Sequence, residues 1–393
     1  RLDGLRKAHA AAAKALAPKD RSLANDVAAS FEELAAIMAG LGALGELSPR
    51  VRDYLVARGE RLAARFLVAA LTAEGAAAEY VDALTVIRTH GPHGQAAPDH
   101  AAIRQAARRH LTPLLVAGVI PVLPGFLGAM PNGDVATLGR GGSDLTATLL
   151  GLALGAAEVT LWKDVPGLLT ADPRIVPDAR VLSQIHYREA GELAYYGAKV
   201  LHPRALIPVA GRGIPVRIRP FGDPDAAGTE ISARRVLGNS PVKALTAATG
   251  QAMVTVEGNG MLGVPGVAAR TFGALHVADL SVSLISQASS EHSICFTLPS
   301  ESAERARAAL LAAFRTELDR GDVDQVEILR GVATIAVVGL GMIGTPGVAA
   351  RLFESLAVSG INVIAIAQGS SELNISLVVA EADVPAALRQ IHL

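Results

Sequence analysis

Aromatic residues are scarce in this sequence, and cysteine is nearly absent. Phenylalanine, tyrosine and tryptophan together make up 4% of the 393 residues, and Cys295 is the single cysteine. One cysteine excludes a disulfide within the chain and is typical of a reducing compartment. The formal net charge of -1 lacks the basic excess of a nucleic-acid-binding surface. We therefore expect no nucleic-acid partner and a core of small aliphatic side chains.

Long apolar runs without helix breakers are also missing. The uncharged stretch at residues 111–132 contains four prolines, which would interrupt a membrane-spanning helix. Residues 1–17 lead into an alanine-rich helical pattern and not into the apolar core of a signal peptide. The sequence thus predicts a cytoplasmic protein with no membrane partner.

Periodicity divides the rest of the chain into a helical first third and an alternating middle third. A chain of this length predicts two to three domains. Helix-period stretches lie near residues 5–17, 23–41, 49–71 and 99–117. Apolar β-type runs at residues 119–123, 159–162 and 216–218 are separated by helical runs at residues 144–156 and 187–196. Such alternation favours an α/β fold with a mostly parallel sheet covered by helices.

The last third contains an internal repeat. Gly258–Leu275 recurs 81 residues later as Gly339–Leu356, with 12 of 18 positions identical. Each copy has the pattern strand, glycine turn, helix, strand, polar turn and strand, and a second helix follows at residues 302–314 or 384–391. The repeat predicts two copies of one small βαββαβ unit.

A glycine motif in the second copy invites a different interpretation. Residues 335–344 form a strand that leads into G-x-G-x-x-G, the pattern of a dinucleotide-binding turn. The first copy has the same spacing at residues 258–263, and Pro265 or Pro346 follows each motif. The acidic residue expected to bind the ribose is missing after the strand at 361–366. A dehydrogenase is therefore the weakest hypothesis for this chain.

The densest polar group is TLGRGGSD at residues 137–144. Its glycines would let backbone N–H groups approach an anion, and Ser143 would cap the helix at residues 144–156. Arg140 has the planar guanidinium that binds a carboxylate with two hydrogen bonds. The alternative is a glycine turn with a serine cap and no ligand.

Two further segments carry charged residues near predicted strand or helix ends. Lys163 and Asp164 end an apolar strand, and the following loop continues to Arg174. Ligands of parallel α/β sheets bind at the carboxyl ends of strands. Lys199 follows the helix at residues 187–196 and could neutralise phosphate charge, although a solvated surface lysine is the alternative.

Together these segments resemble the aspartate kinases of the amino-acid kinase family. The motifs that carry the resemblance are LGRGGSD, W-x-DVPG followed by ADPR, and GELAYYGAKVLHPRALIPV. ARGERL at residues 57–62 resembles the family's helix with a substrate-contacting glutamate, and the repeat resembles its two ACT units. The resemblance implies an amino-acid kinase sandwich with a central, mostly parallel sheet. It places the catalytic domain at residues 1–235 and the ACT units at residues 245–320 and 330–393.

The resemblance also implies an activity and a set of site residues. The chain would transfer the γ-phosphoryl group of ATP, with Mg²⁺ bridging the phosphates, to the β-carboxylate of L-aspartate. Lys199, Arg140 and Asp144 would be catalytic. Aspartate would be bound by Glu60, Arg140, Gly141, Gly142 and Ser143. ATP would be bound by Lys163, Asp164, Leu169, Arg174, Lys199 and Val200.

The repeat implies regulation. Gln287 and Gln368 occupy equivalent positions in the two copies and would read an amino-acid effector together with Asn374, although plain surface glutamines are the alternative. The surrounding residues are most similar to bifunctional aspartate kinase–homoserine dehydrogenases, which favours threonine as the inhibitor, with lysine as the alternative. We expect a homodimer or homotetramer through the ACT units, and possibly a fused homoserine dehydrogenase downstream.

Two departures from the family pattern matter for activity. The family's N-terminal K-F-G-G-T-S motif is not in this sequence, so we expect a longer native N-terminus and little activity from this chain alone. Lys163 and Leu169 stand where many relatives have threonine and tyrosine, which affects the adenine contacts. The main rival hypothesis is a catalytically silent amino-acid sensor. Another carboxylate kinase, such as acetylglutamate kinase, would lack the duplicated end.

Overall fold

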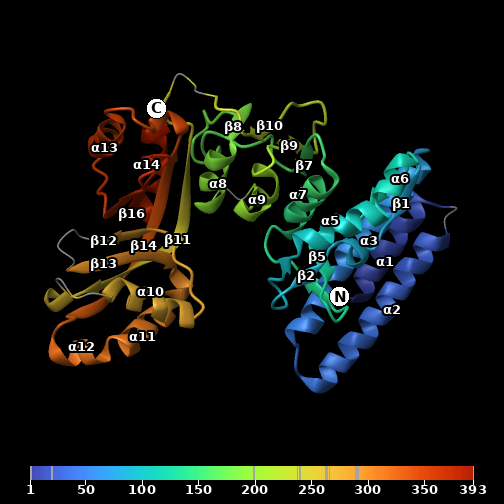
Figure 1. Ribbon diagram of the computed structural model, residues 1–393, viewed down its shortest axis with the longest axis horizontal. Coiled ribbons are helices and arrows are strands. Elements are labelled where there is room, and N and C mark those ends of the chain that lie inside the picture. The colour runs from blue at the N-terminus through green and yellow to red at the C-terminus, as the bar shows by residue number, and fades with distance from the viewer. Residues whose placement is uncertain are drawn as a thin grey trace. The chain divides into compact units, whose positions relative to one another are not determined.

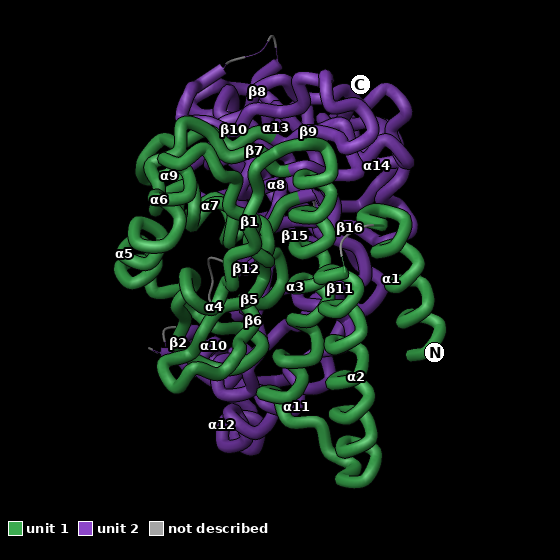
Figure 2. The backbone as a smooth tube through the Cα atoms, turned by 90° about the vertical axis from the view of Figure 1, so that its right-hand side faces the viewer, with its two compact units in different colours: residues 1–161, 201–217 green, residues 162–200, 218–393 purple. Residues whose placement is uncertain are grey.

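The computed structural model describes two compact units (Figures 1 and 2). Unit 1 comprises residues 1–161 and 201–217, and unit 2 comprises residues 162–200 and 218–393. The described residues are 2–18, 21–197, 200–236, 238, 240–261, 264, 266–287 and 292–392. Lys199 and the glycine-motif residues Gly263 and Pro265 lie outside them.

Three long helices begin unit 1: α1 (Leu2–Leu16), α2 (Arg21–Leu44) and α3 (Pro49–Ala73). They pack around a small apolar cluster that includes Leu23, Phe31 and Leu62. By length and composition, α2 is the one helix among the described residues that could cross a membrane, but a helix of a soluble protein can pass the same test.

The remainder of unit 1 is a mixed α/β layer. Strands β1 (Ala78–Tyr80) and β4 (Ile120–Val122) form a parallel pair. Two short antiparallel pairs accompany it. The antiparallel pairs are β2 (Thr89–His90) with β3 (Ala97–Pro98), and β5 (Leu127–Ala129) with β6 (Val135–Thr137). Helices of this part are α4 (Ala83–Val86), α5 (His100–His110), α6 (Thr112–Val116), α7 (Gly142–Leu154) and α9 (Ile207–Ala210), with a 3₁₀ turn η1 (Pro203–Ala205).

The single helix predicted near residues 99–117 is wrong in one respect. The structure breaks it at Leu111 into α5 and α6. Pro113 lies in the first turn of α6, where its missing N–H group costs nothing, whereas inside a continuous helix it would remove a hydrogen bond.

A four-stranded sheet of order β7-β9-β10-β8 follows. Strands β8 (Gln184–His186) and β10 (Thr229–Ser232) pair in parallel, and α8 (Tyr187–Tyr195) begins directly after β8. The other two strands are β7 (Val159–Lys163) and β9 (Val216–Pro220).

The repeat forms one antiparallel sheet of six strands, with the order β12-β13-β11-β14-β16-β15. The first copy runs β11 (Ala244–Glu257), α10 (Val267–Val277), β12 (Ile285–Gln287), β13 (Ser293–Pro299), α11 (Ala303–Ala313) and α12 (Arg315–Arg320). The second runs β14 (Gln325–Val338), α13 (Val348–Val358), β15 (Ala365–Gln368), β16 (Asn374–Ala380) and α14 (Val384–His392). The predicted βαββαβ order is confirmed, and β14 is both the last strand of the first copy and the first strand of the second copy.

The two long strands are shared between the copies. Residues 244–248 of β11 pair with residues 334–338 of β14, next to the strand pair β14–β16 of the second copy. Residues 251–257 of β11 pair with both β13 and the first half of β14. The register shifts between these halves, where Gly250 has a φ of 68°. Each copy therefore completes its sheet with half a strand that the sequence assigns to the other copy.

The glycine motifs have a packing role in this exchange. A Cβ atom on Gly339 would overlap the carbonyl oxygen of Pro241, which leads into β11. A Cβ atom on Gly258 would likewise overlap the carbonyl oxygen of Asp322, which leads into β14. Equivalent close approaches in both copies explain the repeated glycines without a dinucleotide.

Candidate functional site

Glu60 lies on one face of α3. Asp53 and Ala57 are buried two turns and one turn before it, respectively, and Glu60 itself is half-buried. The spacing of four and then three residues places all three on the same face of the helix. Burial raises the pKa of the Glu60 carboxyl, because a charged carboxylate is less well solvated there. A cationic group such as a substrate ammonium would offset that cost.

The glycine loop leads directly into α7, but not as the sequence predicted. Ser143 does not cap this helix: α7 begins at Gly142, and Gly141 is the N-cap residue with a φ of 73° and no side-chain cap. The left-handed conformation at Gly141 turns the chain two residues earlier than expected, which puts Ser143 in the first turn. First-turn N–H groups have no partner within a helix and favour an anion. Arg140, just before the turn, is exposed.

Residues of the segment 201–217 support this loop from within unit 1. A Cβ atom on Gly141 would overlap the side chain of His202. Arg204 donates from Nη1 to the carbonyl oxygen of Leu138 at 3.3 Å. Burial lowers the pKa of His202, the charges of Arg204 and Arg140 lower it further, and Asp144 raises it. The charges of Arg140 and Arg204 thus both act at His202, beside the turn, and positive charge there favours an anion.

Phe126 is held in an unusual conformation beside the loop. Its φ is 73°, which is uncommon for a bulky residue. Its N–H group donates to Thr146 Oγ1 at 3.1 Å, and its carbonyl oxygen accepts from Leu138 N at 2.8 Å. Strained backbone of this kind clusters at functional sites. The preceding Gly125 packs against the Cα atom of Ser143.

All six predicted ATP residues belong to the part of unit 2 at residues 162–200. Lys163 is the last residue of β7, and its carbonyl oxygen accepts from Phe221 N at 2.8 Å. Asp164 follows it and is exposed, and Leu169 is half-buried. These residues therefore lie at a strand end and in the loop after it, as predicted.

The loop with Arg174 is tied to the repeat. Arg174 is exposed and donates two hydrogen bonds to Asp172, which raise the pKa of its guanidinium. Ala171 and Val176, on either side, are buried in the apolar core of the second copy of the repeat. Leu245 N, in β11, donates to the carbonyl oxygen of Thr170 at 2.8 Å.

The remaining members of the ATP set follow α8. Lys199 cannot be placed, because it lies outside the described residues, and Val200 is half-buried. Just before them, Gly197 has a φ of 121°, and a Cβ atom there would lie 2.7 Å from the carbonyl oxygen of Ala247 in β11. Gly197 therefore packs closely against β11 of the repeat.

The predicted effector residues occupy comparable positions in the repeat. Gln287 and Gln368 are exposed at the last positions of β12 and β15, two edge strands that lie close to each other. A cavity of about 370 Å³ lies next to Gln368, with Met342, Thr345 and Glu372 in its lining. Ligand pockets of comparable volume are common in proteins.

Asn374, the third predicted effector residue, starts β16. Its Nδ2 donates to Ser376 Oγ and to Glu192 Oε2, both at 3.0 Å. Its Oδ1 is buried and has no hydrogen-bond partner among the described residues. A buried oxygen of this kind would gain from a donor such as an ammonium group.

The sequence analysis did not identify two buried carboxylates, those of Asp53 and Glu189. Asp53 is considered below. Glu189 forms a capping box at the start of α8, where its Oε2 accepts from His186 N at 3.0 Å. Its Oε1 accepts from Leu340 N, in the second copy of the repeat, at 2.7 Å. The capping-box spacing was visible in the sequence, but the contact to Leu340 joins residues 151 positions apart.

Comparison with known proteins distinguishes a kinase part from a duplicated regulatory part of the chain. The sequence model of the amino acid kinase family matches residues 3–220, and the ACT domain model matches residues 254–314 and 335–393. The aspartokinase of Schizosaccharomyces pombe is 34% identical over 383 residues, which cover 92% of this chain and 72% of that protein. This chain belongs to the aspartokinases of the amino acid kinase family.

Other aspartokinases extend the comparison. The chloroplastic bifunctional aspartokinase/homoserine dehydrogenase 1 of Zea mays is 39% identical over 93% of this chain, but the chain spans only 40% of its length. E. coli aspartokinase III has been solved in complex with aspartate and ADP, in the R-state, with a TM-score of 0.85 and 32% identity over 100% of this chain and 85% of that one. Its T-state complex with lysine and aspartate gives a TM-score of 0.71, again at 32% identity, over 93% and 81% of the two chains. The predicted fold and family are confirmed.

Proposed function

We propose that this chain is the catalytic and regulatory part of an aspartate kinase, which phosphorylates the β-carboxylate of L-aspartate with MgATP. The observation that carries the proposal is the glycine turn at Gly141, which opens the N-terminus of α7 beside His202, where the charges of Arg140 and Arg204 both act. The similarity to a solved aspartokinase with bound aspartate and ADP supports it.

The proposed chemistry is a direct transfer. An oxygen of the aspartate β-carboxylate attacks the γ-phosphorus, the bond from that phosphorus to the ADP oxygen breaks, and ADP leaves. The product is the mixed anhydride 4-phospho-L-aspartate. Phosphoryl transfer of this kind depends on positioning and charge neutralisation, and Mg²⁺ enters with ATP. No covalent enzyme intermediate is required.

Each predicted residue has a role in this proposal. Arg140 binds a substrate carboxylate with paired hydrogen bonds, and Glu60 pairs with the substrate ammonium. Gly141 and Ser143 present backbone N–H groups, Gly142 N donates to the carbonyl oxygen of Gly139 and so fixes the turn, and Asp144 belongs to the catalytic set. Lys199 would stabilise charge on the transferred group. The nucleotide would contact Lys163, Asp164, Leu169, Arg174 and Val200.

The test is aspartate-dependent ADP release by the full-length protein, with hydroxylamine trapping of the acyl phosphate. Loss of a hydrogen-bonded charge costs about 1.5–3 kcal/mol, so Arg140→Ala should lower kcat/KM for aspartate by about 10- to 150-fold. Arg108→Ala, which removes an exposed arginine of α5, is the matched control. Absence of aspartate-dependent ADP release would overturn the proposal, and amino-acid binding without ATP turnover would favour the catalytically silent sensor.

We also propose that the repeat binds an amino-acid effector, with threonine favoured and lysine as the alternative. The cavity beside Gln368 and the unpartnered Oδ1 of Asn374 support a ligand with an ammonium group. Calorimetric titration with each amino acid separates the two. Threonine binding that is lost in Gln287→Ala or Gln368→Ala would support the threonine assignment, and binding of lysine alone would reverse it. Absence of binding for both would remove the effector role of these glutamines.

The whole protein's assembly belongs to the same proposal. The exposed ends of the edge strands β12 and β15 suit pairing of ACT units between subunits, as in a homodimer or homotetramer. Sedimentation of the protein with and without effector would measure the subunit number. A fused homoserine dehydrogenase and a cytoplasmic location remain predictions.

A further inference from the structure

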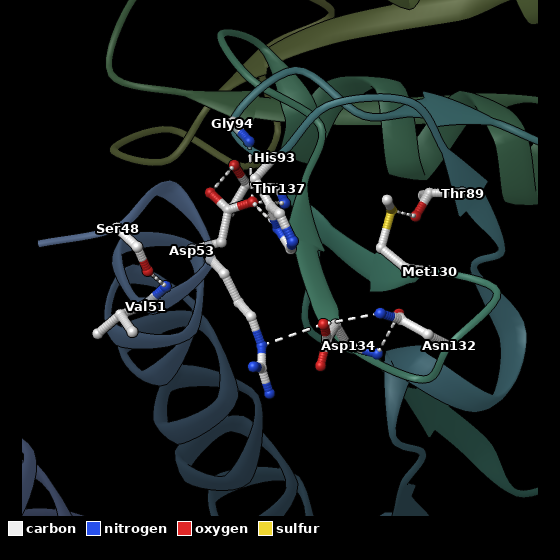
Figure 3. A network of polar contacts seen from close by, with 11 residues as sticks. Ser48, Val51, Asp53, Thr89, His93, Gly94, Met130, Asn132, Asp134 and Thr137 are labelled. Atoms are coloured by element: carbon white, nitrogen blue, oxygen red, sulfur yellow. Dashed lines mark hydrogen bonds and ion pairs between the residues drawn. The ribbon is translucent and has the colours of Figure 1, made fainter.

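Asp53 lies at a junction of three separate segments of unit 1 (Figure 3). Its Oδ2 accepts hydrogen bonds from Gly94 N at 2.8 Å and from Thr137 N at 3.0 Å. His93 Nδ1 lies 3.1 Å from the same oxygen and donates in the tautomer protonated there. Oδ1 accepts from the hydroxyl of Thr137 at 2.8 Å. One carboxylate thus joins α3, the loop at residues 93–94 and the end of β6.

This carboxylate is deeply buried, with 3% of the side chain exposed. Burial of a carboxylate is costly unless donors replace the lost water. Four donors do so here: the N–H groups of Gly94 and Thr137, the Thr137 hydroxyl and the ring of His93. The buried carboxylate is stable only while these donors surround it, so the three segments are held in one favourable geometry.

Two of the joined segments carry the proposed aspartate-binding residues. Glu60 follows Asp53 by seven residues on the same face of α3, about 10 Å along the helix axis. Arg140 follows Thr137 by three residues, at the start of the glycine turn. The distance between the two binding residues therefore depends on how α3 is fixed to the end of β6.

The third segment, the loop at residues 93–94, also contacts the chain that leads into the glycine turn. Ala96 N donates to the carbonyl oxygen of Thr137 at 2.9 Å. A Cβ atom on Gly139 would lie 3.0 Å from the carbonyl oxygen of Gly94. The loop around Gly94 is thus packed against the residue that precedes Arg140, and Asp53 fixes that loop as well.

We propose that Asp53 is a positioning residue that sets the spacing between Glu60 and Arg140 for aspartate binding. The inference rests on the proposed function, because it concerns the same substrate. Asp53 does not itself touch the substrate in this proposal. Without its carboxylate, α3 and the glycine turn can shift independently, and small displacements of binding groups cost large factors in rate.

Substitutions at Asp53 separate this role from general support of the fold. Asp53→Ala removes all four acceptor contacts. Asp53→Asn keeps one oxygen for the N–H donors. Its amide N–H can donate to the Thr137 hydroxyl, because a hydroxyl oxygen can also accept a hydrogen bond. A positioning role therefore predicts that aspartate affinity falls in the order parent, Asn and Ala, while ATP affinity is unchanged.

The experiment measures KM for aspartate, KM for ATP and kcat of the full-length protein at several temperatures below its unfolding transition. We expect Asp53→Ala to raise KM for aspartate by about tenfold or more and Asp53→Asn to raise it less, with KM for ATP within about twofold. Asp99→Ala is the matched control. It removes a carboxylate that accepts from Ala101 N and Ala102 N at the start of α5, so it should lower stability without changing either KM.

Two outcomes would overturn the inference. One is a lower melting temperature for Asp53→Ala with KM for aspartate within about twofold of the parent, which is the result of a purely structural role. The other is an equal rise of both KM values. Thr137→Val, which removes only the hydroxyl contact, gives the same comparison if Asp53→Ala does not fold. A parent that turns over no aspartate rejects the proposed function, whereas an active parent with unaffected variants rejects only the role of Asp53.

Discussion

Asn374 donates a hydrogen bond from Nδ2 to the carboxylate of Glu192, with 3.0 Å between the two atoms. Asn374 begins β16 of the second ACT copy, and Glu192 belongs to α8. The chain leaves α8 toward Lys199, the residue proposed to stabilise the transferred phosphoryl group. An effector that binds Asn374 differently in two states can therefore bias α8 by that difference in binding free energy.

The first prediction concerns this contact. Glu192→Ala removes the acceptor that joins Asn374 to α8, so inhibition by the effector should weaken. Allosteric coupling is commonly worth about 1–3 kcal/mol, and we expect the half-inhibitory effector concentration to rise by about fivefold or more. Glu304→Ala, which removes an exposed partner of Arg330, is the control. An inhibition curve identical to that of the parent would show that coupling does not pass through Glu192.

The second prediction concerns the buried carboxylate of Glu189. Its two oxygens each accept from a different backbone donor, Leu340 N and His186 N. An amide has one acceptor oxygen, so Glu189→Gln leaves one of these N–H groups unpaired and Glu189→Ala leaves both. We expect each to lower the free energy of unfolding by about 1–3 kcal/mol in urea titrations.

A matched surface carboxylate tests the role of burial at Glu189. Glu381 accepts from Gly250 N near the solvent. Its replacement by glutamine should change the free energy of unfolding by less than about 0.5 kcal/mol. Equal losses at the two positions would contradict the importance of the buried contact.

The third prediction concerns pH. Burial raises the pKa of Glu60, so the folded protein holds this proton more tightly than the unfolded chain. The stabilising contribution is present below the unfolded-state pKa and is lost as pH rises through the folded-state pKa. Glu60→Gln should therefore stabilise the ligand-free protein at neutral pH, and this advantage should vanish in acid.

The same shift affects substrate binding. Only ionised Glu60 pairs with the aspartate ammonium, so aspartate affinity should weaken with falling pH before an exposed glutamate would protonate. Titrations of aspartate binding against pH, with the parent and Glu60→Gln, measure this effect. A parent profile as flat as that of the variant would reject the role of Glu60.

The fourth prediction compares two glycines at opposite ends of α7. Gly141 and Gly155 have φ values of 73° and 65°, so alanine is strained at both. Only at Gly141 would the added Cβ atom also overlap His202, because the space around Gly155 is open. We expect Gly155→Ala to cost about 1–2 kcal/mol of stability with normal KM values.

At Gly141 the expected loss is functional. Gly141→Ala should lower kcat/KM for aspartate by about 100-fold, because it displaces the turn next to Arg140. Steady-state kinetics of the two variants, with melting temperatures, make the comparison. Similar kinetics for both would mean that backbone strain alone decides the outcome.

The sequence predicted those features that depend on local pattern. The duplicated unit and the long helices follow from periodicity and self-similarity, and the structure confirms them. The cap at Ser143 was wrong because the left-handed turn at Gly141 starts the helix earlier. Serine is a common cap, but a glycine that can adopt positive φ competes with it.

Long-range contacts set the limit of such prediction. Nothing in the local pattern indicates that Asp53 accepts from Thr137, since the two lie 84 residues apart. The exchange of half-strands between β11 and β14 is hidden for the same reason, because both halves have the alternation of any strand. The glycine motifs could be recognised as repeats, but the backbone that packs against them, at Pro241 and Asp322, could not be predicted from the sequence.

Ala171 and Val176 are buried among the side chains of the second ACT copy, which matters when the ACT copies are replaced by those of a homologue. A chimaera that takes its sensing half from another homologue and joins it near residue 235 would retain the host's residues 171–179 in a foreign core. The mismatch would fall on the loop that carries Arg174. Successful grafts should therefore transplant this short segment together with the sensor, although the two are more than 60 positions apart in the chain.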